Sequence, residues 1–214
     1  MVAAFFDVDH TMLPGTSVER LFVRDLWHRG GLGLRDLART GASILGSGRG
    51  SLARRIKSNK TYLAGKPVAD VAAHAKPFVM EVIRPRLSAG ALEMLEWHRQ
   101  QGHRVVLLTG SLEVLVRPLA DALGIETVLS TRLEQQDGVY TGRWIPPHPY
   151  AEGKRMLLEQ FARENGVDLT RSYAYGDSLA DQPMLSAVGY PRVVNAGWGM
   201  RRLARRLGWP VLHW

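Results

Sequence analysis

The stretch AAFFDVDHTML, residues 3–13, decides the fold. Its first four residues, 3–6, are apolar and include two aromatic side chains, a composition typical of a short buried strand. Asp7 and Asp9 follow at once, with one residue between them. Burying a carboxylate costs free energy unless a cation or hydrogen bonds compensate for it. The stretch therefore predicts either a turn that faces water or a strand end that holds a cation and performs chemistry.

Other apolar runs predict that this strand belongs to a parallel sheet. The predicted strands are RVVLLTGS (104–111), SYAYGDS (172–178) and YPRVVNAG (190–197), with weaker candidates at 127–130 and 209–212. Apolar residues at helical spacing predict helices over 88–100, 112–123 and 152–165. Strands that alternate with such helices form right-handed βαβ units. Fully apolar strands indicate a sheet covered on both faces, so we predict an α/β fold with a doubly wound, Rossmann-like parallel sheet.

Two segments depart from this alternation. Residues 133–144 carry Asp137-Gly138 between alternating residues, which predicts a small β-hairpin flap. The segment 15–85 shows no convincing core strand. It carries helical patterns at 18–27, 34–45, 53–63 and 68–82, and the glycine-rich 46–51 is interpreted as a turn between helices. We predict a catalytic core formed by 1–14 and 86–214, with 15–85 inserted as a helical cap.

Composition bounds the class of protein. The chain has 214 residues, enough for a sizeable core, and contains no cysteine. This excludes a disulfide framework, a thiolate metal site and a cysteine nucleophile, and it fits a reducing compartment. We expect no signal peptide, because no basic leader precedes the first apolar residues and Asp7 and Asp9 interrupt them early. No apolar run approaches the ~20 residues of a spanning helix, so we expect a cytoplasmic protein.

The formal net charge is +8, and part of it lies in RRLARR, residues 201–206. Such a run can bind nucleic acid or an anionic membrane, but a solvated helix face explains it more simply. We expect the nearby Trp198, Trp209 and Trp214 to pack in the core and at the sheet edge.

Polar side chains gather where the predicted strands end. In a doubly wound sheet, ligands bind beyond the carboxyl ends of the strands. The residues found at strand ends or helix starts are Asp7, Asp9, Thr109, Gly110, Ser111, Lys154, Asp177, Ser178 and Asp181. Because strand residues two apart share a face, Asp7 and Asp9 can point into one pocket.

The donor set of this pocket suits magnesium and phosphate. Asp7, Asp9 and Asp177 offer oxygen ligands and no soft donor, which favours Mg²⁺. The Thr-Gly-Ser turn at 109–111 precedes a helix, and its N–H groups and hydroxyls can bind the oxygens of an anion. Lys154 adds a positive charge. Together these groups predict a phosphoryl-transfer site.

The division of roles follows from charge. A phosphate dianion repels a carboxylate nucleophile, so the cation and Lys154 must neutralise the phosphoryl oxygens during attack. One aspartate then attacks while the other protonates the departing alkoxide. The second can stay protonated, because a neighbouring negative charge favours its neutral form.

The motifs, in this order, resemble those of the haloacid dehalogenase superfamily of phosphohydrolases, in its branch related to phosphoserine phosphatase. DVDHT resembles the first family motif, LLTGS the second, Lys154 the third and YGDSLADQPML the fourth. The resemblance covers essentially the whole chain, and it implies a helical cap after the first strand. It implies that Asp7 is the nucleophile, forming an aspartyl-phosphate, and that Asp9 is the general acid/base.

The same resemblance implies the ligand set. Mg²⁺ would be held by the Asp7 carboxylate, the Asp9 carbonyl and Asp177, with Ser178 and Asp181 in support. Thr109, Gly110, Ser111 and Lys154 would hold the phosphoryl group. Because the dehalogenases proper lack the second acid, Asp9 favours a phosphatase.

Three features bear on the substrate. Phosphoserine phosphatases typically read G-D-G-x-N-D in the fourth motif, where this chain has Ser178 and Ala180. Glu19 falls a few residues later than the glutamate that meets the substrate amine in those enzymes. The first motif DHT and the sequence PPHPYAEGK (146–154) resemble a subgroup of phosphatases, some relatives of which are linked to histidinol phosphate or lysophosphatidic acid. Phosphoserine-, histidinol-phosphate- and lysophosphatidate-type esters are the candidate substrates. His148 and Tyr150 either line the mouth of the pocket or pack on the hairpin.

Two other classes of protein were weighed against the phosphomonoesterase. A phosphate-accepting receiver module also uses an acidic pocket and a lysine, but it needs neither a helical insert nor a second acid. A protein that binds nucleic acid or anionic membrane through its basic surface would show binding that falls steeply with salt. We expect a small phosphomonoester as substrate and no nucleic-acid partner, with weak association to anionic membrane as a hypothesis. The sequence does not predict the oligomeric state.

Overall fold

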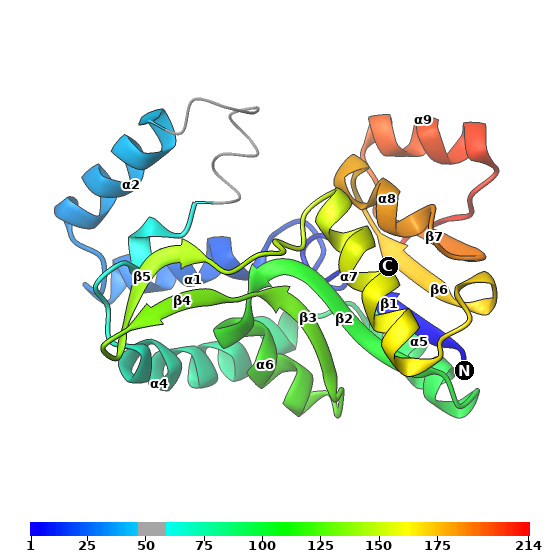
Figure 1. Ribbon diagram of the computed structural model, residues 1–214, viewed down its shortest axis with the longest axis horizontal. Helices are drawn as coiled ribbons and strands as arrows, with labels where there is room; N and C mark the ends of the chain where they lie inside the picture. Colours follow the sequence, from blue (N-terminus) through cyan, green and yellow to red (C-terminus); the bar gives the residue numbers. More distant parts are fainter. Residues whose placement is uncertain (47–58) are drawn as a thin grey trace.

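The structure is a computed structural model that describes residues 1–46 and 59–214 (Figure 1). Six strands of the described residues form one parallel sheet in the order β3-β2-β1-β6-β7-β8. They are β1 (Ala3–Phe6), β2 (Arg104–Leu112), β3 (Thr127–Thr131), β6 (Tyr173–Gly176), β7 (Tyr190–Val194) and β8 (Val211–Leu212). The strand order reverses beside β1, which makes this the switch point of a doubly wound sheet. The predicted fold class is confirmed.

Both faces of the sheet are covered, as its apolar strands require. In β1, Ala4 and Phe6 point into one buried cluster, and Ala3 and Phe5 point into another. The first face is covered by α5 (Ala89–Gln100) and α6 (Glu113–Ala122). The second is covered by α7 (Glu152–Asn165), α8 (Gln182–Leu185) and α9 (Trp198–Leu207). Burying a phenylalanine side chain stabilises the fold by roughly 1.5–3 kcal/mol, so β1 anchors both layers.

The inserted segment (residues 15–85) is helical where the structure describes it, at 15–46 and 59–85. Its elements are α1 (Val18–His28), α2 (Leu34–Gly46), η1 (Thr61–Leu63), α4 (Val68–Phe78), the π-helical η2 (Val79–Ile83) and η3 (Arg84–Arg86). The predicted turn at 46–51 and most of the predicted helix at 53–63 lie outside the described residues. Apolar side chains of α1 and α4 belong to the same buried cluster as α5 and α6. The division into core and cap stays a prediction.

The hairpin forms as expected and joins the inserted segment. It consists of β4 (Leu133–Gln136) and β5 (Val139–Trp144), which pair antiparallel. Both turn residues, Asp137 and Gly138, have positive φ, at 50° and 76°, as a two-residue hairpin turn of type I′ requires. Gly65 N–H donates to the Tyr140 carbonyl oxygen at 2.7 Å, and Tyr140 N–H donates to the Lys66 carbonyl oxygen at 3.0 Å. The hairpin thus extends from the sheet to the inserted segment (Figure 1).

The three tryptophans near the end of the sequence have different environments. Trp214 stacks on Phe6 and packs against Tyr175, and Trp209 packs against the second cluster. The expectation of core packing is wrong for Trp198, which is 75 % exposed and carries the Arg202 guanidinium 5.5 Å above its ring. Trp198 begins α9, and only the side of that helix around Leu203 faces the sheet. None of the helices in the described residues is long and apolar enough to cross a membrane.

Candidate active site

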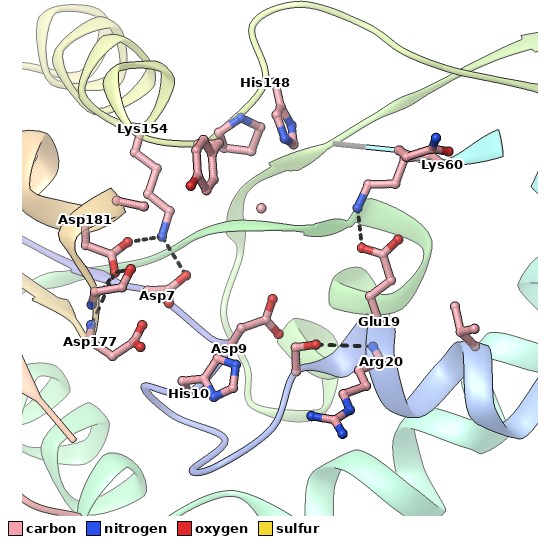
Figure 2. Close-up of a pocket in the computed structure, with 18 of the residues that line it drawn as sticks. Asp7, Asp9, His10, Glu19, Arg20, Lys60, His148, Lys154, Asp177 and Asp181 are labelled. Atoms are coloured by element: carbon pink, nitrogen blue, oxygen red, sulfur yellow. Dashed lines mark hydrogen bonds and ion pairs between the residues drawn. The ribbon is translucent and has the colours of Figure 1, made fainter. Parts of the chain in front are cut away.

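A cavity of about 440 Å³ opens beyond the carboxyl ends of β1, β2 and β6, between the sheet and the inserted segment. Figure 2 shows its two ends, with Lys154 and the aspartates on one side and Lys60 and Glu19 on the other. The core end is lined by Asp7, Asp9, His10, Gly110, Lys154, Asp177, Ser178 and Asp181, and the flap side by His148, Pro149 and Tyr150. The insert end is lined by Ser17, Glu19, Arg20, Val23, Leu32, Thr40, Asn59, Lys60 and Tyr62.

Asp7 lies at the end of β1 and is only 4 % exposed. Its N–H donates to the Tyr175 carbonyl oxygen at 3.0 Å, which continues the sheet by one residue and fixes the backbone. The Thr11 hydroxyl donates to Asp7 Oδ2 at 3.2 Å. The loop that follows turns at His10, whose φ is 62°, and His10 N–H donates to the Thr16 carbonyl oxygen. Asp7 is therefore presented by a backbone held on both sides.

Asn195 supports the same loop from the end of β7. Its side-chain amide donates to the carbonyl oxygens of His10 and Thr11, and its side-chain oxygen accepts from the Trp214 N–H at 3.0 Å. We did not select Asn195 from the sequence, although it follows the apolar strand YPRVV directly. The rule that polar residues gather at strand ends points to it.

Lys154, at the start of α7, joins two acidic loops. Its Nζ donates to Asp7 Oδ1 at 2.7 Å and to Asp181 Oδ1 at 2.5 Å, and all three side chains are buried. The helix start lies directly against the loop that follows β5, because a Cβ atom at Gly153 would overlap the His148 carbonyl oxygen. Only glycine fits there, which explains the Glu-Gly-Lys sequence before the lysine.

Asp181 organises the loop after β6. Its Oδ2 accepts from the Ser178 hydroxyl at 2.8 Å and from the backbone N–H groups of Ser178 and Asp177. Together with the backbone N–H of Asp181, this makes a capping box at the start of a short 3-10 helix, η5 (Leu179–Asp181). Asp181 is thus bound on both oxygens, while its neighbour Asp177 is half-buried and faces the cavity.

Burial and charge shift the pKa values of these groups in opposite directions. Burial raises the pKa of Asp7 to about 7, against the lowering effect of Lys154 and with the repulsion of Asp181 and Asp9. Burial also opposes ionisation of Asp181, but Lys154 and Ser178 outweigh it and lower its pKa. The pKa of Lys154 is raised, because its two carboxylate partners outweigh burial. The lysine therefore stays a cation, and burial together with the nearby carboxylates makes the ionised form of Asp7 costly although Lys154 pairs with it.

Asp9 is held by the inserted segment and by the turn after β2. Its Oδ1 accepts from Val18 N–H at 2.8 Å, and its Oδ2 accepts from the Ser111 hydroxyl at 2.8 Å. Val18 is the first residue of α1, where a carboxylate interacts favourably with the helix dipole. Asp9 thus connects the core end of the cavity to the start of the insert.

The predicted phosphate-binding turn contributes to the cavity unevenly. Gly110 lines the cavity, whereas Thr109 and Ser111 are buried beside it. Thr109 Oγ1 accepts from Ser111 N–H at 3.2 Å. The Thr131 hydroxyl donates to the Gly110 carbonyl oxygen at 2.7 Å, so it accepts its 3.0 Å hydrogen bond from His148 Nδ1. His148 lines the cavity, and its ring also packs against Trp144 of the hairpin. Both alternatives given for this residue, lining the pocket and packing on the hairpin, therefore apply.

The acidic cluster fits a small divalent cation. One carboxylate oxygen each from Asp7, Asp177 and Asp181 lie within 4.8 Å of one another. These are hard oxygen donors, the type that Mg²⁺ prefers. Two buried carboxylates and the half-buried Asp177 lie beside Lys154, and a bound cation would offset the negative charge that remains. The donor chemistry therefore agrees with the predicted metal. Asp181 is itself a member of this cluster, whereas the resemblance implied only a supporting position for it.

The insert end of the cavity contains a group that we did not predict. Lys60 pairs with Glu19, and the Tyr62 hydroxyl donates to Glu19 Oε1 at 2.9 Å. No local pattern connects Lys60 with Glu19, because 41 residues separate them. The structure brings all the predicted site residues to one end of the cavity or directly beside it. Their roles stay predictions.

Comparisons with known proteins place this architecture in a family. The family model for haloacid dehalogenase-like hydrolases matches residues 4–186. A probable phosphatase of Mycobacterium tuberculosis is 34 % identical over 215 residues, covering 98 % of this chain and 74 % of its own length. A phosphoserine phosphatase of the same organism is 32 % identical over 215 residues, covering 98 % of this chain and 70 % of its own length.

A solved structure agrees with the fold over nearly the whole length. A Bordetella pertussis protein of unknown function superposes with a TM-score of 0.84 at 29 % identity, covering 98 % of this chain and 97 % of that one. The family model, the named relatives and the parallel sheet with aspartates at its switch point all indicate the same family. The chain belongs to the haloacid dehalogenase-like hydrolase family and is an enzyme of its phosphatase branch.

Proposed function

We propose that this enzyme is a Mg²⁺-dependent phosphomonoesterase that works through an aspartyl-phosphate on Asp7. One observation carries the proposal: Lys154 Nζ binds Asp7 Oδ1 at 2.7 Å, at the core end of a cavity that Asp9 also lines. A nucleophile, a cation beside it and a second acid are thus arranged around one space. A receiver module would need no second acid and no helical wall over the pocket.

In the first step, an Asp7 oxygen attacks phosphorus and the bond between phosphorus and the ester oxygen breaks. Lys154 holds the attacking carboxylate in place and attracts the phosphoryl oxygens. Asp9, in its protonated form, gives its proton to the departing alkoxide, so the leaving group departs as an alcohol. Val18 N–H and the Ser111 hydroxyl hold Asp9 in position for this transfer.

In the second step, a water molecule attacks the phosphorus of the aspartyl-phosphate. Asp9 is now ionised and accepts the proton from that water, the bond between Asp7 and phosphorus breaks, and inorganic phosphate leaves. The enzyme returns to its starting state with Asp9 protonated. Gly110 lies beside the space that the phosphoryl group would fill, and Thr109 and Ser111 support this turn.

The side chains of Asp7, Asp177 and Asp181 would hold the metal ion, and by family resemblance the Asp9 carbonyl would be a further ligand. Bound there, Mg²⁺ would supply positive charge that offsets the phosphoryl oxygens and the buried carboxylates. Without that positive charge, burial raises the pKa of Asp7 to about 7.

The substrate that we propose is a small phosphorylated metabolite. A cavity of about 440 Å³ lies at the lower end of the range for small-molecule sites. The relatives named phosphatase and phosphoserine phosphatase support this class. Phosphoserine-, histidinol-phosphate- and lysophosphatidate-type esters are the starting candidates.

The proposal is tested with an aryl phosphate and the purified enzyme. We expect turnover that requires Mg²⁺, stops on chelation and returns when Mg²⁺ is restored. Soaking crystals with beryllofluoride should place the adduct on the Asp7 side chain. Turnover that is unaffected by chelation, or an adduct on another residue, would contradict the proposal.

The basic face of α9 offers one observation on partners. Trp198 is largely exposed beside Arg202, and three further arginines of this helix are exposed. An aromatic ring among arginines suits the interface of an anionic membrane, and we retain weak membrane association as a proposal. Co-sedimentation with anionic vesicles at low salt tests it. A Trp198→Ser variant that binds as well as the wild type would contradict it. We propose no nucleic-acid partner and a cytoplasmic location.

A further inference from the structure

The insert end of the cavity contains an ion pair between the buried Lys60 and the half-buried Glu19, which catalysis does not use. Lys60 is 2 % exposed, and its Nζ donates to Glu19 Oε2. Glu19 Oε1 accepts from the Tyr62 hydroxyl at 2.9 Å. Both carboxylate oxygens are therefore occupied by donors from η1 and the residue before it. All three residues line the cavity, and Figure 2 shows Lys60 and Glu19 across from Lys154.

This pairing closes Glu19 to a substrate ammonium group. An ammonium would have to displace Lys60 from Oε2 or lie beside it, where the two positive charges repel each other. Tyr62 has the same effect at the other oxygen, since its displacement would leave a buried hydroxyl without a partner. Glu19 thus serves to compensate the buried Lys60.

Lys60, in contrast, keeps donors for a ligand. An ammonium group has three N–H donors, and within residues 1–46 and 59–214 Lys60 Nζ makes a hydrogen bond only to Glu19. Its side chain is buried and lines the cavity. Arg20, the third residue of α1, also lines this end of the cavity, but Figure 2 shows its guanidinium directed away from Lys60. Lys60 is therefore the cation that the insert end presents to a ligand.

We propose that Lys60, held by Glu19 and Tyr62, is the specificity-determining residue for the leaving group and selects phosphomonoesters that carry a carboxylate and no ammonium. Such substrates are phosphorylated hydroxy acids. The phosphate lies at Asp7 and Lys154, and the carboxylate reaches across the cavity to Lys60. This inference rests on the proposed phosphomonoesterase function and adds a substrate class to it.

Three esters separate the charges. 3-Phosphoglycerate and O-phosphoserine differ only in a hydroxyl against an ammonium, and O-phosphoethanolamine has the ammonium without the carboxylate. We expect kcat/KM, measured by phosphate release, to be at least about tenfold higher for 3-phosphoglycerate than for phosphoserine, and lowest for phosphoethanolamine. Both 3-phosphoglycerate and phosphoserine offer the same carboxylate, so their ratio measures the repulsion between the substrate ammonium and Lys60. An aryl phosphate without either group serves as the reference ester.

Two variants change the charge at the insert end. Lys60→Met removes the cation and exposes the Glu19 carboxylate, so the preference for 3-phosphoglycerate over phosphoserine should be lost or reversed. The change should appear mainly in KM, because the interaction is made in both ground and transition state. Glu19→Gln keeps the cation and should preserve or increase the preference. Each kcat/KM is expressed relative to that of the aryl phosphate in the same variant.

Two further proteins complete the set. Lys66→Met removes another lysine of the inserted segment, one that binds the Gly31 carbonyl oxygen and Asp36 outside the cavity, and it should leave every ratio unchanged. If Lys60→Met does not fold, the double variant Glu19→Gln/Lys60→Met removes both charges, and its ratio should fall to about one.

The outcomes distinguish this inference from the proposed function. Turnover of the aryl phosphate together with a preference for phosphoserine or phosphoethanolamine would overturn the inference alone. So would aryl phosphate turnover with none of the three esters hydrolysed, or a preference that survives the loss of Lys60. Absence of Mg²⁺-dependent turnover of every ester would overturn both.

Discussion

The two ends of the cavity are built in different ways. At the core end, the functional side chains lie within short motifs at strand ends or helix starts, and backbone hydrogen bonds fix the segments that carry Asp7 and Asp181. Asp7 continues β1 by one residue, and Asp181 caps the helix after β6. At the insert end, Glu19 and Lys60 come from separate elements and are held mainly by each other. The core end is thus set by the backbone, and the insert end by side-chain pairing.

This difference suggests a division of labour. A site fixed by backbone geometry keeps one chemistry, because moving any part requires the sheet to change. A site fixed by side chains can change specificity with one or two substitutions, while the reacting groups stay in place. Four predictions test this contrast.

The largest effect is expected for Asp7→Asn. An amide cannot act as the nucleophile, so kcat for an aryl phosphate should fall by at least about a thousandfold, as for the loss of other catalytic nucleophiles. Circular dichroism should show an intact fold, because removing one of several clustered carboxylates relieves repulsion. Asp70→Asn, at an exposed position of α4, is the matched control. A folded Asp7→Asn protein that keeps most of its rate would refute the assignment.

The next effect concerns the backbone of the core end. In Gly153→Ala, the new Cβ would overlap the His148 carbonyl oxygen, so the start of α7 and with it Lys154 must shift. We expect turnover to fall by about a hundredfold from misplacement of the lysine, and the free energy of unfolding to fall by about 1–3 kcal/mol. Gly197→Ala is the control, because no atom lies within 4 Å of a Cβ there. If both variants kept the same turnover and the same free energy of unfolding, the contact with His148 would not position the lysine.

A smaller effect concerns pH and the support beneath the core end. His98 is buried between His103 Nδ1 and the Tyr175 hydroxyl, both at 2.8 Å. Burial, with the charges of His103 and Arg192, lowers the pKa of His98 to about 3. The native state holds this ring neutral while the unfolded chain protonates it near pH 6.5. Stability should therefore be full above pH 6.5 and fall as the pH drops toward 3, by up to about 1.4 kcal/mol per pH unit.

Denaturant unfolding at several pH values measures this slope. His103, whose pKa burial and Arg171 also lower, adds to it in the same direction. A His98→Gln variant should show a shallower slope between pH 6.5 and 5. An identical slope in the variant would mean that other groups cause the acid sensitivity.

The smallest effect is expected at the insert end. Tyr62→Phe removes only the hydroxyl that donates to Glu19. The loss of this hydrogen bond should lower the free energy of unfolding by about 0.5–1.5 kcal/mol. The kcat for an aryl phosphate should not change, because the core end does not depend on Tyr62. A loss of kcat comparable to that of Gly153→Ala would remove the contrast between the two ends.

Much of the core end follows from the sequence, because its signals are local. The apolar run before Asp7, the Thr-Gly-Ser turn and the Asp-Ser-Leu-Ala-Asp loop each combine a strand end with polar groups, and in a parallel sheet all strand ends of this kind share one edge. The hairpin also follows from its Asp-Gly turn. These elements needed no information about distant parts of the chain.

The insert end does not follow, because its contacts are not local. The partnership of Lys60 with Glu19 spans 41 residues and lies between helical elements whose relative position no periodicity specifies. Trp198 shows a related failure: its large apolar ring predicts burial, but its position at the start of α9 directs it to solvent beside Arg202. In both cases, tertiary arrangement decided what residue type alone does not.

Asn195 shows how far the influence of one amide extends. It connects the loop after Asp7 to the backbone of Trp214, whose ring in turn stacks on Phe6. Opening fluctuations of β8 and of the nucleophile loop should therefore occur together, as one unit in native-state hydrogen exchange. A ligand that reduces the opening of the loop would then also slow hydrogen exchange of β8, with which it makes no contact. The exchange rates of amides near Trp214 would therefore report whether the site is occupied.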